Sequence, residues 1–163
     1  MTGLFSVISP QTSCTPIFSG LPTQSTSSVP QGMPDFLRQH AIAALHAVDQ
    51  LREHVAPLLQ ISEVRTIAAD HLWMSPCYKQ DCVAIHFTWK KDWDRVSKLL
   101  PMIEEQLEPF NARPHWGKLF TMDPARLKSL YEKLPEFRKL LQLYDPQGKF
   151  RNEFLNKYIF DAF

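Results

Sequence analysis

The sequence predicts an α+β fold, with elements in the order helix, strand, strand, helix, strand and further helices. Residues 58–67 and 82–89 are rich in β-branched and aromatic residues, which is typical of strands. Apolar residues recur every three or four positions over 37–55 and 93–107, which predicts amphipathic helices. The chain has only five glycines, and none forms the Gly-rich loop of a nucleotide-binding fold.

The composition is that of an ordinary globular protein. The 163 residues favour one domain, and a net charge of +1 gives no electrostatic argument for nucleic acid or an anionic membrane. No apolar run reaches the ~18 residues needed to span a bilayer. Three cysteines cannot all pair within the chain, so a secreted disulfide scaffold is not indicated and a cytoplasmic protein is expected.

Composition changes sharply near residue 35. Residues 1–34 contain no Asp, Glu, Lys or Arg, but they hold seven Ser, five Thr and five Pro. Such a segment has little periodic apolar surface, so we expect it to be disordered or non-native sequence. The folded domain is expected over 35–163, with Asp35 as the N-cap of its first helix.

The first elements of that domain follow a simple order. The first helix is expected to run from Asp35 to Val55 and to stop before Pro57. Two strands, 58–67 and 82–89, come next.

The second half is predicted to be mainly helical. The helix over 92–107 contains Pro101, which costs ~3 kcal/mol in a helix interior, so a kink or two shorter helices are expected. Residues 112–120 return to extended chain. Pro124 and Pro135 each begin a short helix. The second of these is expected to turn four side chains inward: Phe137, Leu140, Leu141 and Tyr144.

Alternation along the two strands places polar side chains on shared faces. Glu63 and Arg65 are two residues apart, as are His86 and Thr88. If the strands are neighbours, these four converge on one patch that Lys118 can join. Such a set can bind a polyol, or stabilise an oxyanion or a reduced cofactor. The alternative is the solvated polar face that any half-buried antiparallel sheet presents.

A zinc site is a remote alternative. His71, Cys77, Cys82 and His86 are all possible ligands. The spacing lacks the tight C-x2-C knuckle, and strand geometry separates Cys82 from His86 by ~13 Å. We therefore predict no metal site.

Four motifs resemble the C-terminal part of the FAD-dependent alditol (xylitol) oxidase and D-arabinono-1,4-lactone oxidase family. They are ISEVRTIAADHLWMSP, VAIHFTW, ARPHWGKLF and YDPQGKFRNEFL. The resemblance covers about residues 36–163 and extends to the wider vanillyl-alcohol-oxidase type of flavoprotein. It implies a substrate domain, built on an antiparallel sheet with flanking helices, that covers the flavin ring. Residues 1–34 show no Gly-rich pyrophosphate segment and no histidine, so we expect the family's FAD-binding domain to be absent from this chain.

The resemblance also implies roles for the polar residues. Arg65 and Lys118 are expected to hold positive charge near the reduced flavin and the reacting hydroxyl. Glu63 and Thr88 are expected to orient substrate hydroxyls, and His86 to assist proton removal. The flavin side of the site is expected to be formed by Arg65, His115 and Lys118, with Trp116 as either a wall or a ligand contact.

The function implied is oxidation of a CH–OH group in an alditol or aldono-1,4-lactone, with oxygen as acceptor. The flavin carries that chemistry, so FAD is not expected to bind stably to this chain alone. The chain is expected to be a fragment that is inactive alone, with its FAD-binding domain supplied by another chain or missing. The alternative is a non-catalytic polyol-binding or interaction module. Separation from a flavin domain also leaves apolar surface exposed, which predicts self-association.

Overall fold

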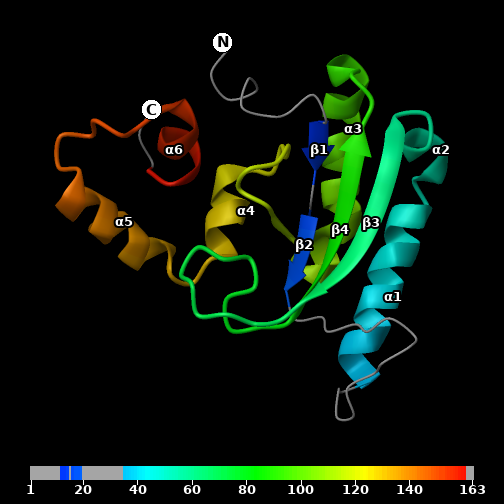
Figure 1. The fold of residues 1–163 in the computed structure, drawn as a ribbon, viewed down its shortest axis with the longest axis horizontal. Coiled ribbons are helices and arrows are strands. Elements are labelled where there is room, and N and C mark those ends of the chain that lie inside the picture. Colours follow the sequence, from blue (N-terminus) through cyan, green and yellow to red (C-terminus); the bar gives the residue numbers. More distant parts are fainter. Residues whose placement is uncertain (1–11, 15, 20–34, 161–163) are drawn as a thin grey trace.

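The computed structural model describes residues 12–14, 16–19 and 35–160. The elements are β1 (Thr12–Cys14), β2 (Pro16–Ser19), α1 (Asp35–Asp49), α2 (Arg52–Val55), β3 (Leu59–Ile67), β4 (Cys82–Trp89), α3 (Trp93–Leu107), the 3-10 helix η1 (Glu108–Phe110), β5 (Arg113–Pro114), α4 (Pro124–Ser129), α5 (Leu134–Tyr144) and α6 (Glu153–Tyr158). Helices flank an antiparallel sheet, so the predicted α+β class is confirmed (Figure 1).

Strand β4 is the centre of the sheet. It pairs with β3 along its whole length in antiparallel register, with Glu63 opposite His86. On its other edge it pairs with β1 and then β2, and β5 continues the sheet from β2. In the described part of the chain, β3 is therefore an edge strand.

Alternation along β4 builds the main hydrophobic core. Val83, Ile85, Phe87 and Trp89 all lie on the face that α1 and α3 cover, and all four are buried. The rings of Phe87 and Trp89 stack with their centroids 5.2 Å apart. Asp92 caps α3 by accepting a hydrogen bond from the Arg95 N–H, which fixes where the helix begins after β4.

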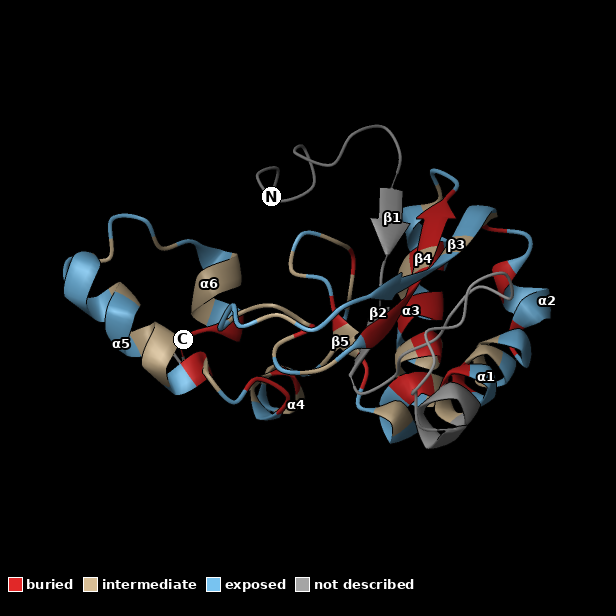
Figure 2. Ribbon diagram, turned by 60° about the horizontal axis from the view of Figure 1, so that its bottom comes forward, coloured by how far each residue is buried: buried red, intermediate tan, exposed pale blue. Residues whose placement is uncertain are grey.

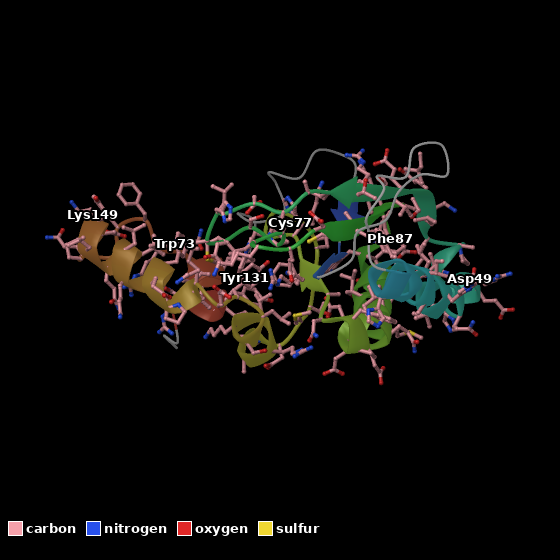
Figure 3. All side chains as sticks on the ribbon, turned by 90° about the horizontal axis from the view of Figure 1, so that it is seen from below. Asp49, Trp73, Cys77, Phe87, Tyr131 and Lys149 are labelled. Atoms are coloured by element: carbon pink, nitrogen blue, oxygen red, sulfur yellow. The ribbon has the colours of Figure 1, made fainter. Side chains whose placement is uncertain are left out.

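A second core lies in the C-terminal third, to one side of the sheet. It joins α4 to α6 and includes Leu127, Tyr131 and Ile159. The side chains of Cys77 and of Tyr131, a member of the second core, lie near the middle of the molecule (Figure 3). The loop before β4 is therefore held between the sheet and the C-terminal helices.

Two helix predictions differ from the structure. A turn at Gln50 and Leu51 separates α1 from α2, so a single helix to Val55 is wrong. Conversely, α3 runs unbroken through Pro101, so of the two alternatives expected there the two shorter helices are wrong, and the kink stays a prediction. Burial of Leu100, Ile103 and the neighbouring apolar positions of α3 outweighs the local cost of the proline.

The end of the chain also departs from the prediction. The extended segment expected over 112–120 is a strand only at β5, and turns follow it. In α5, Phe137 and Leu141 pack partly against the second core, but Leu140 and Tyr144 are 40% and 78% exposed. The far end of α5 extends beyond that core, so its apolar stripe has no surface there to cover it (Figure 2).

Strands β1 and β2 lie inside residues 1–34, the segment expected to fall outside the folded domain. Residues 12–14 and 16–19 pair with β4 and β5, whereas 1–11, 15 and 20–34 lie outside the described residues. The domain boundary at residue 35 stays a prediction. No helix among the described residues has the length and apolar character needed to cross a membrane.

Candidate functional site

The polar face of the β3–β4 pair carries a cluster of three contacting side chains. The Oε2 atom of Glu63 accepts a hydrogen bond of 2.6 Å from Arg65. The same atom lies 3.2 Å from Nδ1 of His86. The strand pairing thus brings Glu63, Arg65 and His86 together, as strand alternation predicted.

The register of the two strands explains this contact. Glu63 stands directly opposite His86, and Arg65 follows two residues later on the same face. The Ser62 hydroxyl also donates to the backbone oxygen of His86 at 2.9 Å, which helps to fix the register. The hydrogen bond from His86 and the charge of Arg65 lower the pKa of Glu63 below its ordinary value of 4.5. Glu63 is therefore an anion near neutral pH.

His86 has a second ring nitrogen that faces the protein interior. Its Nε2 atom is buried and has no hydrogen-bond partner among the described residues. A buried polar atom of this kind generally has a partner in a complete structure. Thr88, two residues further on the same face, is 6% exposed. Within the described part of the chain, this buried nitrogen therefore lacks the partner that such atoms generally have.

Lys118 and His115 come from the turn that follows β5. The Lys118 N–H donates to the His115 carbonyl at 3.0 Å, and the Gly117 N–H donates to Nδ1 of His115 at 3.0 Å. Partial desolvation lowers the pKa of His115, although the residue as a whole is exposed, and the charges of Lys118 and His86 add to this effect. The pKa of His115 is thus affected by the charge of Lys118 in the turn and by that of His86 on β4.

Trp116 has a packing role in the structure. Its indole N–H donates to the Met74 carbonyl at 3.0 Å. Its ring lies 4.9 Å from that of Tyr131 and 6.3 Å from that of Phe154, measured between centroids. The indole thus joins the loop before β4 to the second core.

The four residues considered as zinc ligands do not assemble. Cys77 and Cys82 are both buried, with their thiols hydrogen-bonded, whereas His86 contacts Glu63. Among the described residues, no group of three or more His, Cys, Asp or Glu side chains is arranged to hold a metal ion.

Arg113 is a residue that sequence reasoning did not single out. Its Nη1 donates to the Pro76 carbonyl at 2.9 Å, and its guanidinium lies 5.3 Å from the centre of the Tyr131 ring. Burial lowers the pKa of Arg113 below its ordinary value. Its sequence signal is its place at the start of RPHWGKLF. That signal does not show that Arg113 is a partly buried cation beside an aromatic cluster, which becomes clear once the fold is known.

A cavity of the described residues lies elsewhere. It has a volume of about 270 Å³ and is formed between α3 and the segment that leads into α4, with Leu107, Phe120 and Arg126 among its lining residues. None of the clustered residues of β3 and β4 lines it. The polar cluster of β3 and β4 therefore lies outside this cavity.

Comparison of the sequence with known proteins places the chain in a family. A family model described as D-arabinono-1,4-lactone oxidase matches residues 22–158. The chain belongs to this family. The match confirms the resemblance predicted from the four motifs, and it begins within the segment 1–34.

Individual relatives agree with that assignment. An alditol oxidase from Streptomyces sp. (strain IKD472 / FERM P-14339) is 50% identical over 118 residues, which are 72% of this chain and 28% of that protein. The L-gulonolactone oxidase of Scyliorhinus torazame is 31% identical over 101 residues, 60% of this chain and 23% of that protein. The L-gulono-1,4-lactone dehydrogenase of Mycobacterium tuberculosis is 25% identical over 119 residues, 72% of this chain and 27% of that protein.

The chain spans about a quarter of the length of the curated relatives that it matches. The family is one of oxidoreductases that act on alditols and aldonolactones. The matched part of the chain corresponds to the C-terminal domain of this D-arabinono-1,4-lactone oxidase family.

Proposed function

We propose that this chain forms the substrate side of an FAD-dependent oxidase that acts on a CH–OH group of an alditol or an aldono-1,4-lactone, with oxygen as acceptor. The observation that carries the proposal is the contact of Glu63 with both Arg65 and His86 on one polar sheet face. Family membership and the names of the relatives support the substrate class.

The residues present fit a flavin and a polyhydroxylated substrate. The unpartnered Nε2 of His86 can meet a hydroxyl group, and the guanidinium of Arg65 supplies positive charge on the same face. A bound flavin would accept the hydride from the substrate carbon. FAD is expected to be held mainly by the family's FAD-binding domain, with Arg65, His115 and Lys118 as the contacts from this side.

The side chains have separate tasks in this proposal. Arg65 and Lys118 stabilise the negative charge that develops as the substrate is oxidised. Glu63 and Thr88 orient substrate hydroxyls. Because Glu63 occupies Nδ1 of His86, Nε2 is the nitrogen that takes the proton from the reacting hydroxyl.

A chimera tests the proposal. In it, the 118 matching residues of the Streptomyces alditol oxidase are replaced by those of this chain. We expect the chimera to oxidise a sugar alcohol, with R65A and K118A each lowering kcat/KM roughly tenfold to a thousandfold. K149A is the matched control, because Lys149 lies at one end of the molecule, far from Phe87 of β4 (Figure 3).

Three results would decide against the proposal. An active chimera whose turnover is unaffected by R65A and K118A would remove the assigned roles. Sugar-alcohol binding by the isolated chain in calorimetry, without any activity in the chimera, would favour a polyol-binding module. Stoichiometric flavin absorption in the purified chain would show that no second domain is needed to hold FAD.

A further inference from the structure

The exposed strand β3 has a chemically symmetric sequence. From Ile61 to Ile67 it reads Ile-Ser-Glu-Val-Arg-Thr-Ile. Around the central Val64, a charged residue, a hydroxyl residue and an isoleucine follow in the same order in both directions. The two charged residues have opposite sign, so the segment is complementary to an antiparallel copy of itself.

The outer edge of β3 is open in the described part of the chain. The strand pairs with β4 alone, and Ile61, Val64 and Ile67 are 56%, 52% and 37% exposed. Figure 2 shows β3 as an exposed band beside the buried β4. Proteins usually protect such an edge with Pro, Lys or a bulge. Ile61 to Ile67 contains no Pro or Lys, and the register irregularity lies before it, between Leu59 and Ile61.

We propose that two copies of this chain pair through β3, antiparallel, about a two-fold axis that passes through Val64. Val64 then faces Val64 of the partner subunit, and Glu63 faces Arg65 of the partner subunit. Ile61 likewise faces Ile67 of the partner subunit, so each polar face continues into the other. Opposite charges and apolar pairs directly across strands are the contacts that stabilise a sheet.

The charges also select this register over its neighbours. A shift of two residues in one direction places Glu63 against Glu63 of the partner subunit. A shift in the other direction places Arg65 against Arg65 of the partner subunit, and like charges directly opposite are unfavourable. A shift of one residue joins the helix-covered face of one copy to the polar face of the other.

The occupant that fits this edge is a second copy, because the complementarity is internal to the segment. Glu63 and Arg65 cancel in charge, and each already contacts the other within one chain. Pairing also brings Arg65 of the partner subunit next to the carboxylate that contacts His86. Each candidate site then has guanidinium groups from both subunits.

Charge reversal tests the proposal with the purified 163-residue chain. The unsubstituted chain is expected to show a monomer–dimer equilibrium in sedimentation velocity. E63R places Arg against Arg across the axis and R65E places Glu against Glu, so each should weaken the dimer roughly tenfold or more. Mixed in equal amounts, E63R and R65E restore both opposite-charge pairs, so dimer should return. This recovery is expected to weaken at high salt.

A cross-link checks the register without altering charge. Directly paired residues have Cα atoms ~4.5–5.5 Å apart, which a disulfide can bridge. V64C is therefore expected to give a covalent dimer on mild oxidation. I42C is the matched control, since Ile42 on α1 is 48% exposed against 52% for Val64. Circular dichroism of each variant shows that it is folded.

The outcomes separate cleanly. A monomer at every concentration overturns the proposal, as does a mixture of folded E63R and R65E that forms no dimer. Large assemblies that neither charge substitution disperses would show non-specific aggregation in its place. Equal cross-linking of V64C and I42C would remove the proposed register.

Discussion

His86 Nδ1 lies 3.2 Å from Glu63 Oε2, and the same oxygen accepts the hydrogen bond from Arg65. One carboxylate oxygen therefore contacts an imidazole and a guanidinium at once. The contact orients the His86 ring and leaves Nε2 as its remaining nitrogen. It also links the two strands of the sheet that the candidate site is built on.

The first prediction concerns the acid stability that this contact supplies. The pKa of Glu63 is lowered in the folded state, so its contribution is present above pH 4.5 and is lost as the pH falls through the lowered value. E63Q carries no titrating carboxyl and should lose that dependence. The effect should be small, because both Arg65 and Glu63 are well exposed and solvent screens them.

Urea denaturation at neutral pH and at about pH 3 measures this difference. E132Q is the control, since the Glu132 carboxylate pairs with Lys79 on the exposed surface and has no contact with β3. A pH dependence that E63Q leaves unchanged would contradict the prediction.

A second prediction concerns Glu104, whose pH dependence has the opposite sign. Its carboxylate accepts hydrogen bonds from the Thr121 N–H at 2.6 Å and from the Thr121 hydroxyl at 2.8 Å. Burial raises its pKa above 4.5, so the free energy of unfolding falls as pH rises from the unfolded-state pKa to the raised folded-state pKa. E104Q removes this fall because its amide does not titrate in this range. The amide can still accept a hydrogen bond from the Thr121 N–H and donate one to the Thr121 hydroxyl oxygen.

The comparison with E104A isolates the hydrogen bonds. At neutral pH, E104Q should be at least as stable as the unsubstituted chain. E104A leaves two donors of Thr121 without their acceptor and should cost about 1–3 kcal/mol. Thermal unfolding of all three proteins over a range of pH provides the measurement. An equal loss for both variants would show that the carboxylate charge itself is required.

Strand alternation was sufficient to predict the centre of the candidate site. Glu63, Arg65 and His86 fall on one face whenever the two strands are neighbours, and β4 has the bounds that its apolar periodicity predicts. The exact opposition of Glu63 and His86 depends on the loop at 68–81, which no local pattern determines. The same limit applies to Lys118, whose position depends on the turn that follows β5.

Periodicity fails where it has to say which surface receives a side chain. The spacing of Leu140 and Tyr144 is that of a buried helix face, but α5 extends past the second core and both residues are exposed. In α3, the penalty for Pro101 is local, whereas the burial that compensates for it involves residues far away in sequence. Both errors arise because tertiary contacts decide what local preference leaves open.

A third prediction concerns Trp116, whose contacts join the loop before β4 to the second core. W116F keeps part of the ring packing but leaves the Met74 carbonyl without its donor, and should cost about 1–2 kcal/mol of the free energy of unfolding. W116A also removes the contacts with Tyr131 and Phe154, and should cost about 3–5 kcal/mol. W73F is the control, because Trp73 is 41% exposed, and it should stay within about 0.5 kcal/mol. A loss for W116F no greater than that for W73F would contradict this role.

The last prediction concerns Pro101, which lies inside the unbroken helix α3. Proline lacks the N–H that would bond to the carbonyl four residues earlier, and its ring crowds that carbonyl. Since Pro101 is exposed, replacing it removes no core contact. P101A should therefore raise the free energy of unfolding by about 1–3 kcal/mol. P109A is the comparison, because Pro109 lies in the first turn of η1, where a missing N–H costs little, and it should change stability far less. Equal effects of the two substitutions would mean that α3 already accommodates its proline without cost.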